Sequence, residues 1–184
     1  MAGAVRTAIG PDKRLPTRRW LDDRFFVRWP GAFAALSRAA SLLPPRSRLR
    51  RALVRRSVLS GWAAWTRDDL DLMLVRYARD FRLEPPREWV AAGMRSAYQG
   101  HAGAREWAAD MREAWERIDA TPQEIVDAGN RLVVLGHFRM RARGSGIEFN
   151  DPVGVVFWIE RGLTVHQPTF NDWDEALRVA GIPT

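Results

Sequence analysis

Three polar residues have the types and positions expected of a catalytic site with apolar walls. Asp151 shares the odd numbering of the apolar residues in the segment 147–160, so strand alternation places its carboxylate on their face. Desolvation raises the pKa of such a carboxylate, which can then move a proton at a carbon next to a carbonyl. Gln167 and Tyr98 are the predicted hydrogen-bond donors to the enolate oxygen that develops in this reaction.

Two of these residues also fit a purely structural role. Asp151 directly precedes Pro152, which suits a solvated strand end or a bulge. Tyr98 also fits a core position with its hydroxyl group bonded locally.

The three histidines have no close spacing, so no metal centre is expected. The sequence has neither a glycine-rich phosphate loop before a helix nor a G-x-S-x-G motif, so neither a nucleotide cofactor nor serine hydrolase chemistry is expected.

Large aromatic residues gather around the stretch GWAAWTRDDLDLMLVRYARDF, which begins at Gly61. Aromatic side chains supply wide apolar walls, and Tyr and Trp keep a polar group that can orient a ligand. The residues predicted to line a ligand-binding pocket are Trp62, Trp65, Tyr77, Trp107, Phe138, Phe157 and Thr169. The alternative is that these aromatics fill a solid core.

Helical patterns come first in the chain and strand patterns follow. Three helices are predicted in this region. The first spans 46–65, the second begins at an N-cap at Asp68 and has an inward apolar stripe that ends at Phe81, and the third spans 103–118. The segments 124–127, 131–143, 147–160 and 163–170 read as successive antiparallel strands, and Asp172 begins a short final helix. This order predicts an α+β fold, in which helices pack on a strongly curved antiparallel sheet and leave a cone-shaped pocket.

Basic charge is concentrated in the first third of the chain. Residues 1–56 carry 13 Arg and 1 Lys against 3 Asp, a net charge of +11, whereas residues 57–184 carry a net charge of −4. There are no cysteines, which excludes disulfides and makes a reducing, cytoplasmic location the expectation. The apolar stretch at 25–45 is interrupted by Arg28, Pro30 and Arg38, so it is too short to span a bilayer.

Apolar residues in this basic segment recur at helical spacing. They are Phe26, Trp29, Phe33, Leu36, Ala40 and Leu43. Such a face packs on the domain that follows, lies in an anionic membrane interface, or contacts a partner chain. Pro44 and Pro45 then break the helix. We therefore divide the chain into a basic amphipathic helical extension at 1–45 and a domain at 46–184.

Several stretches of the second region resemble one known family. They are WTRDDLDLML with YARDF, YQGHAGAREW, DAGNRLVVL with GSGIE, and DWDEAL with AG. Together they resemble the SnoaL-like polyketide cyclase family of the nuclear transport factor 2-like superfamily, which includes ketosteroid isomerase. The resemblance covers roughly residues 50–182. It implies a conical sheet around a mostly apolar pocket, and a homodimer.

The resemblance leaves two functions open. The first is a cofactor-independent isomerase or cyclase that performs acid/base chemistry on a small apolar or carbonyl-bearing molecule. The second is a non-catalytic ligand-binding or dimerisation module, held at an anionic membrane by the basic extension. Close relatives often carry a histidine where this chain has Val155, which weakens the enzymatic reading. Nucleic-acid binding is not expected, because the basic segment contains no known recognition motif.

Overall fold

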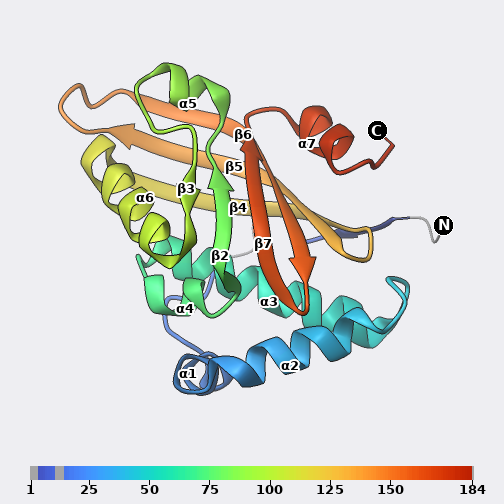
Figure 1. Cartoon of the computed structure of the whole chain (residues 1–184). Helices are drawn as coiled ribbons and strands as arrows, with labels where there is room; N and C mark the ends of the chain where they lie inside the picture. The colour runs from blue at the N-terminus through green and yellow to red at the C-terminus, as the bar shows by residue number, and fades with distance from the viewer. Residues whose placement is uncertain (1–3, 11–14, 184) are drawn as a thin grey trace.

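The computed structural model describes residues 4–10 and 15–183, which form an α+β fold with seven helices and one seven-stranded sheet (Figure 1). The strands are β1 (Val5–Ala8), β2 (Tyr77–Glu84), β3 (Tyr98–Gln99), β4 (Trp115–Asp127), β5 (Arg131–Ala142), β6 (Glu148–Glu160) and β7 (Leu163–Phe170). The helices are α1 (Leu21–Arg28), α2 (Pro30–Ser41), α3 (Arg48–Thr66), α4 (Leu70–Leu74), α5 (Arg87–Ala91), α6 (Gly100–Ala114) and α7 (Trp173–Val179). No helix in these two ranges is long and apolar enough to cross a membrane.

The sheet is curved and does not close into a barrel (Figure 1). Its strand order is β1-β4-β5-β6-β7-β2-β3, and every neighbouring pair is antiparallel except β2 and β7, which run parallel. The predicted meander therefore corresponds to β4–β7, and β2 adds a parallel strand at its side. The expected fold class is confirmed.

Strand alternation divides the core into two parts. Val134, Phe138 and Met140 of β5 belong to the larger cluster, which packs against α3, α4 and α6. Val133 and Leu135 of the same strand belong to a smaller cluster on the other face, beneath α7. The even-numbered residues of β5 therefore face α3, α4 and α6, and the odd-numbered ones face α7.

The helix predicted from Asp68 to Phe81 is much shorter in the structure. Its N-cap is Asp69, whose Oδ1 accepts a hydrogen bond from the Leu72 backbone N–H at 3.2 Å. Asp68 instead has a positive φ of 56°. The helix ends at Leu74, and Phe81 lies in β2. Pairing of β2 with β3 and β7 overrides the helical spacing of these apolar residues.

The boundary between α6 and β4 also differs from the prediction. The expected helix extended to Ile118, but α6 ends at Ala114 and the chain becomes extended at Trp115. Trp115 pairs with Ala142, and Ile118 pairs with Met140, so β4 begins well before the predicted strand at 124–127. The spacing of three between Trp115 and Ile118 suits a helix face, and in β4 a register shift between Trp115 and Arg117 accommodates it.

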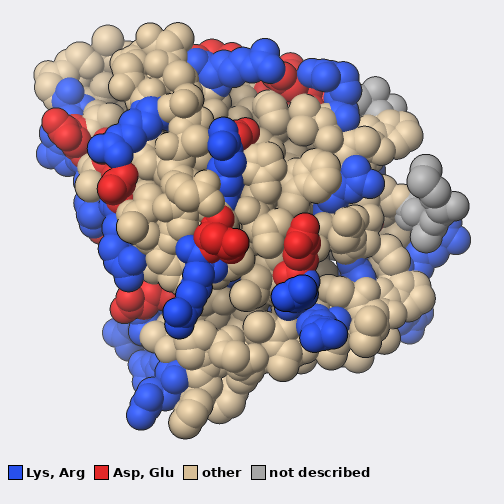
Figure 2. Space-filling model, viewed as in Figure 1, with Lys and Arg blue, Asp and Glu red and all other residues tan. Residues whose placement is uncertain are grey.

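The basic extension packs on the domain rather than standing apart from it. β1 pairs with β4 from Val5↔Asp127 to Ala8↔Glu124, and α1 and α2 lie beneath the sheet in Figure 1. The expected single helical face is split at Trp29, because Pro30 begins a second helix. We call residues 15–45 the arm. Figure 2 shows the basic side chains that remain on the surface over this layer.

The arm approaches the sheet closely at the turn between β6 and β7. Gly162 has a φ of +83°, and a Cβ atom there would lie 2.4 Å from the carbonyl oxygen of Ala34 and 2.7 Å from the backbone nitrogen of Arg38. Glycine therefore satisfies two demands at once, the left-handed backbone of the turn and the space that α2 occupies.

Candidate functional site

A cavity of about 200 Å³ lies between the arm, α3 and the sheet. This volume exceeds the roughly 150 Å³ that accommodates a benzene molecule in an engineered protein core. The arm contributes Phe26, Phe33 and Leu36 to its walls, and α3 contributes Trp62 and Trp65 among others. A small organic molecule therefore fits between these elements.

Aromatic side chains make most of the wall on the helix side. The Trp65 and Trp107 rings are stacked, with centroids 4.2 Å apart and planes 19° from parallel. Trp62 contacts Phe138 of β5 with a centroid distance of 5.8 Å. Because α3, α6 and β5 each supply part of this group, its geometry is fixed by tertiary packing and presents flat apolar surfaces to the cavity.

Tyr77 and Gln167 form the polar group on the sheet side of the cavity. The Tyr77 hydroxyl donates a hydrogen bond to Gln167 Oε1, and both side chains line the cavity. Burial raises the pKa of Tyr77 above its ordinary value, which keeps the hydroxyl protonated. Within the described residues Gln167 Nε2 has no protein acceptor, so its amide hydrogens can be donated to a ligand oxygen.

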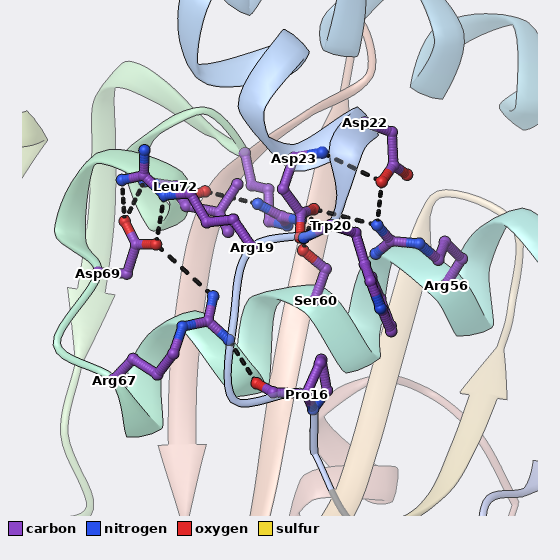
Figure 3. A network of polar contacts seen from close by, with 11 residues as sticks. Pro16, Arg19, Trp20, Asp22, Asp23, Arg56, Ser60, Arg67, Asp69 and Leu72 are labelled. Atoms are coloured by element: carbon purple, nitrogen blue, oxygen red, sulfur yellow. Dashed lines mark hydrogen bonds and ion pairs between the residues drawn. The ribbon is translucent and has the colours of Figure 1, made fainter.

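A buried carboxylate joins the arm to α3 at the edge of the cavity (Figure 3). Asp23 is 1% exposed, and its Oδ1 accepts a hydrogen bond of 2.5 Å from Ser60 Oγ. Its Oδ2 accepts the Trp20 backbone N–H at 3.1 Å, and Arg56 Nη2 lies 3.3 Å from Oδ1. The oxygens of Asp23 are therefore already bonded, which favours a structural role.

Arg76 carries its positive charge into the same region. Its Nη2 donates to Ser60 Oγ at 2.6 Å and lies 3.9 Å from Asp23 Oδ1, and its guanidinium lies 5.2 Å from the centroid of the Phe33 ring. Burial lowers the pKa of Arg76 to about 10, because desolvation disfavours the charged form. Asp23 offsets part of this cost.

Two further ion pairs fix the arm to the domain. Arg50 of α3 donates to Asp127 Oδ1 and Oδ2 at 2.7 Å each, and its Nη1 donates to the carbonyl oxygens of Ser41 and Leu43 at the end of α2. Both side chains of the pair are almost completely buried.

The second ion pair holds the start of the arm (Figure 3). Arg19 donates to both oxygens of Asp69, at 2.6 and 2.5 Å. The hydrogen bonds from Arg19 lower the pKa of Asp69 below its ordinary value. Arg67 donates to the carbonyl oxygen of Pro16 at 2.6 Å. The arm is therefore fastened at both ends by charge-assisted bonds, with apolar contacts between them.

Most of the predicted ligand-binding residues meet at this cavity. Its lining includes Trp62, Trp65, Tyr77, Trp107, Phe138, Phe157 and Gln167. Thr169 is buried but does not line it. Residue type and strand alternation were therefore enough to predict most of the side chains that line this cavity.

The structure places Asp151 and Tyr98 away from the cavity lining. Asp151 is half-buried on β6 opposite Phe138 and does not contribute to the wall. Tyr98 is 2% exposed, and its hydroxyl donates to Asp110 Oδ2 at 2.6 Å. The predicted catalytic group of three is therefore not assembled around one cavity, and the role of Asp151 as a base stays a prediction.

Sequence reasoning missed the contribution of the arm and of Arg76. The periodic residues Phe26, Phe33 and Ala40 were recognised as one helical face, but the pattern does not say what that face covers. Arg76 lies next to a segment that reads as helix and gives no signal of burial. Asp22 and Asp23 are the cavity's carboxylates within the described residues, and both come from the arm.

The sequence profile of the SnoaL-like domain family matches residues 58–167, and the chain belongs to this family. The arm lies outside the matched range. No curated protein matches the chain significantly.

Solved structures of the same fold agree with this assignment. One is a nuclear transport factor 2-like protein of unknown function from Burkholderia pseudomallei, with 25% identity over 67% of this chain and 94% of that chain, and a TM-score of 0.59. Another is TerC crystallised with polyporic acid, with 20% identity over 68% and 92% of the two chains, and a TM-score of 0.58. A third is a polyketide cyclase-like protein from Pseudomonas putida, with 19% identity over 65% and 94%, and a TM-score of 0.51.

Proposed function

We propose that this protein binds a small, mostly apolar molecule that carries a carbonyl or hydroxyl oxygen, in the cavity beneath its arm. The observation that supports this function is the combination of stacked aromatic walls with one polar pair, Tyr77 and Gln167, on the opposite side. Apolar walls supply affinity, and a few placed polar groups fix the orientation of a ligand. The amide of Gln167 is the donor to the ligand oxygen.

Binding without turnover is the function that the cavity supports best. The predicted isomerase or cyclase chemistry uses a carboxylate that is free to take a proton from the ligand. Asp151 does not line the cavity, Asp22 is paired with Arg56, and Asp23 is held by Ser60, Arg56 and the Trp20 amide. Acid/base chemistry at Asp151 is therefore the second proposal, and it requires a substrate that reaches this carboxylate from the cavity.

Native mass spectrometry of the purified protein and titration with 1-tetralone, a two-ring ketone, test ligand binding. Tryptophan fluorescence reports occupancy, because Trp62, Trp65 and Trp107 line the cavity. We expect Val155→Phe to weaken tetralone binding at least tenfold by filling the cavity, and Gln167→Leu to weaken it about fivefold to tenfold by removing one hydrogen bond.

Leu49→Phe is the matched control, because it adds an aromatic ring at a residue that is 60% exposed. Unchanged affinity in Val155→Phe, or neither a co-purified ligand nor tetralone binding, would count against the proposal. Asp151→Asn separates the two functions: it leaves affinity intact in both, but abolishes turnover of any converted ligand only if Asp151 is the base.

A further inference from the structure

The outer surface of the arm carries large apolar side chains that nothing in the described chain covers. Four of them are more than half exposed: Leu21 84%, Phe25 52%, Trp29 58% and Leu42 83%. We call these four residues the arm face. Isolated exposed apolar residues are ordinary, but a gathering of this size on one layer marks a surface that contacts something.

The spacing on α1 shows that this exposure is organised. Leu21, Phe25 and Trp29 are four residues apart and lie along one side of the helix, while Phe26 lies on the side that lines the cavity. The arm therefore has two apolar sides. The inner one closes the cavity, and the outer one is available to a partner.

Exposed arginines lie on the arm and directly after it in the chain. Arg24, Arg28, Arg38, Arg46, Arg48 and Arg51 are all exposed. None of these six forms an ion pair with another residue of the described ranges 4–10 and 15–183. On the side drawn in Figure 2, the lower part over α1 and α2 shows basic side chains among uncharged ones, and the acidic side chains lie higher.

The arginines are also placed to accompany the apolar residues. Arg24 and Arg28 flank the stripe on α1, and the Arg28 guanidinium lies 5.4 Å from the centroid of the Trp29 ring. Long arginine side chains can run along apolar surface while the charge stays in water or among headgroups. Tryptophan beside arginine suits the boundary between headgroups and acyl chains.

The turn between β5 and β6 offers an instructive contrast, because it also exposes Ile147 and Phe149. There the arginines are already engaged. Arg141 pairs with Glu116 at 3.4 Å, and Arg143 donates to the carbonyl oxygens of Arg112 and Trp115. Unpaired positive charge beside exposed apolar groups is thus a property of the arm.

We propose that the arm face docks on the surface of an anionic lipid bilayer, with the arm lying in the plane of the interface. Apolar burial and attraction of these exposed arginines to anionic headgroups act together in this arrangement. A second copy of the chain is a poorer occupant, because two arm faces would bring their arginines together without counter-charge. Leu36 lines the cavity and is 43% exposed, so the edge of the cavity adjoins the docked side.

Co-sedimentation of the full chain with vesicles tests this proposal. The vesicles are phosphatidylcholine alone, or an equal mixture of phosphatidylcholine and phosphatidylglycerol. We expect binding to the mixed vesicles, at least tenfold weaker binding to the neutral ones, and loss of binding in molar salt. The triple variant Leu21→Ala, Phe25→Ala, Trp29→Ala should bind at least tenfold more weakly than the unchanged protein.

Charge is tested with two variants that lose the same net charge. Arg24→Gln, Arg28→Gln, Arg38→Gln should weaken binding to mixed vesicles roughly 100-fold, from about fivefold per arginine. The control Arg79→Gln, Arg105→Gln, Arg139→Gln removes exposed arginines elsewhere and should have a much smaller effect. Ile147→Ala with Phe149→Ala is the apolar control. All of these residues are exposed, so circular dichroism should show folded protein in each case.

Three results would overturn the proposal. The first is equal binding to neutral and anionic vesicles, or no binding to either. The second is an equal loss of binding in the arm variants and their controls. The third is a dimer in sedimentation velocity that becomes a monomer when Leu21, Phe25 and Trp29 are replaced, because the arm face would then be an interface between two copies.

Discussion

The two faces of the sheet are covered in different ways. On one face, α7 packs through aliphatic side chains, and a Cβ atom at Gly154 would lie 2.4 Å from the Cβ of Ala176. On the other face, the arm lies over aromatic residues and leaves a cavity, while its attachment depends on Arg50, Arg19 and Asp23. The contact of α7 with the sheet is dense and apolar, whereas the arm is held by ion pairs around a cavity.

The difference shows how one sheet can support a closely packed core on one face and a cavity on the other. Small aliphatic residues interdigitate and exclude space, so the α7 side contributes stability through close packing. Stacked rings such as Trp65 and Trp107 are rigid and cannot collapse inward to fill the space beside them. Ion pairs at the ends of the arm fix its position without requiring a filled interior.

The largest expected effect comes from removing the attachment of the arm. Asp127→Asn leaves the buried Arg50 charge without its counter-ion, so we expect a loss of about 3–5 kcal/mol in the free energy of unfolding. Urea denaturation measures this loss, and limited proteolysis should show earlier cleavage within residues 15–45. Glu106→Gln breaks the exposed pair with Arg95 and should cost less than about 1 kcal/mol. Equal costs would mean that the arm is not held by buried charge.

A smaller effect separates the two faces directly, through neighbouring residues of β6. Val155 lines the cavity, and Val156 is completely buried beneath α7. Val156→Leu should destabilise the protein by about 1–3 kcal/mol through overpacking, whereas Val155→Leu should be nearly neutral because its extra methylene has room. Thermal unfolding of both variants checks this. If the two substitutions cost the same, the cavity is filled in solution.

The smallest expected effect concerns the polar pair of the cavity. Tyr77→Phe should cost about 1–2 kcal/mol at neutral pH, because Gln167 Oε1 loses its donor. The folded-state pKa of Tyr77 is raised, so its contribution is complete below the ordinary tyrosine pKa of 10.0 and declines as the pH rises above it. The difference between the two proteins should therefore shrink from pH 10 upward in urea denaturation. A difference that grows there would contradict burial of this hydroxyl.

The parts of the fold that depend on local pattern were predictable from the sequence. The strands β5, β6 and β7 follow from alternation bounded by turn residues, and the face that bears Phe138 and Phe157 follows with them. The N-cap at Asp172, whose side chain accepts the Glu175 backbone N–H at 2.6 Å, was also recognisable. These features need only neighbours in the chain.

Features set by partners distant in the chain were not predictable. Phe81 has helical spacing, and it is extended because β7, more than eighty residues away, supplies its pairing strand. Asp23 and Arg76 carry no sign of burial in their own segments, since the low exposure of each arises from the arm meeting α3. Asp151 has the predicted parity and pairs with Phe138, but it does not line the cavity, because alternation fixes the face of a strand and not which residues of that face border a cavity.

Gly162 has a consequence for how this protein can diversify. The contact that seats α2 at this turn is made by backbone atoms of Ala34 and Arg38, so it does not depend on the side chains that α2 turns toward the cavity. Replacing Phe33 or Leu36 would thus change the volume of the cavity while the backbone of α2 stays at the same distance from the sheet. Selectivity can be retuned from this one helix, with the sheet and its aromatic walls unchanged.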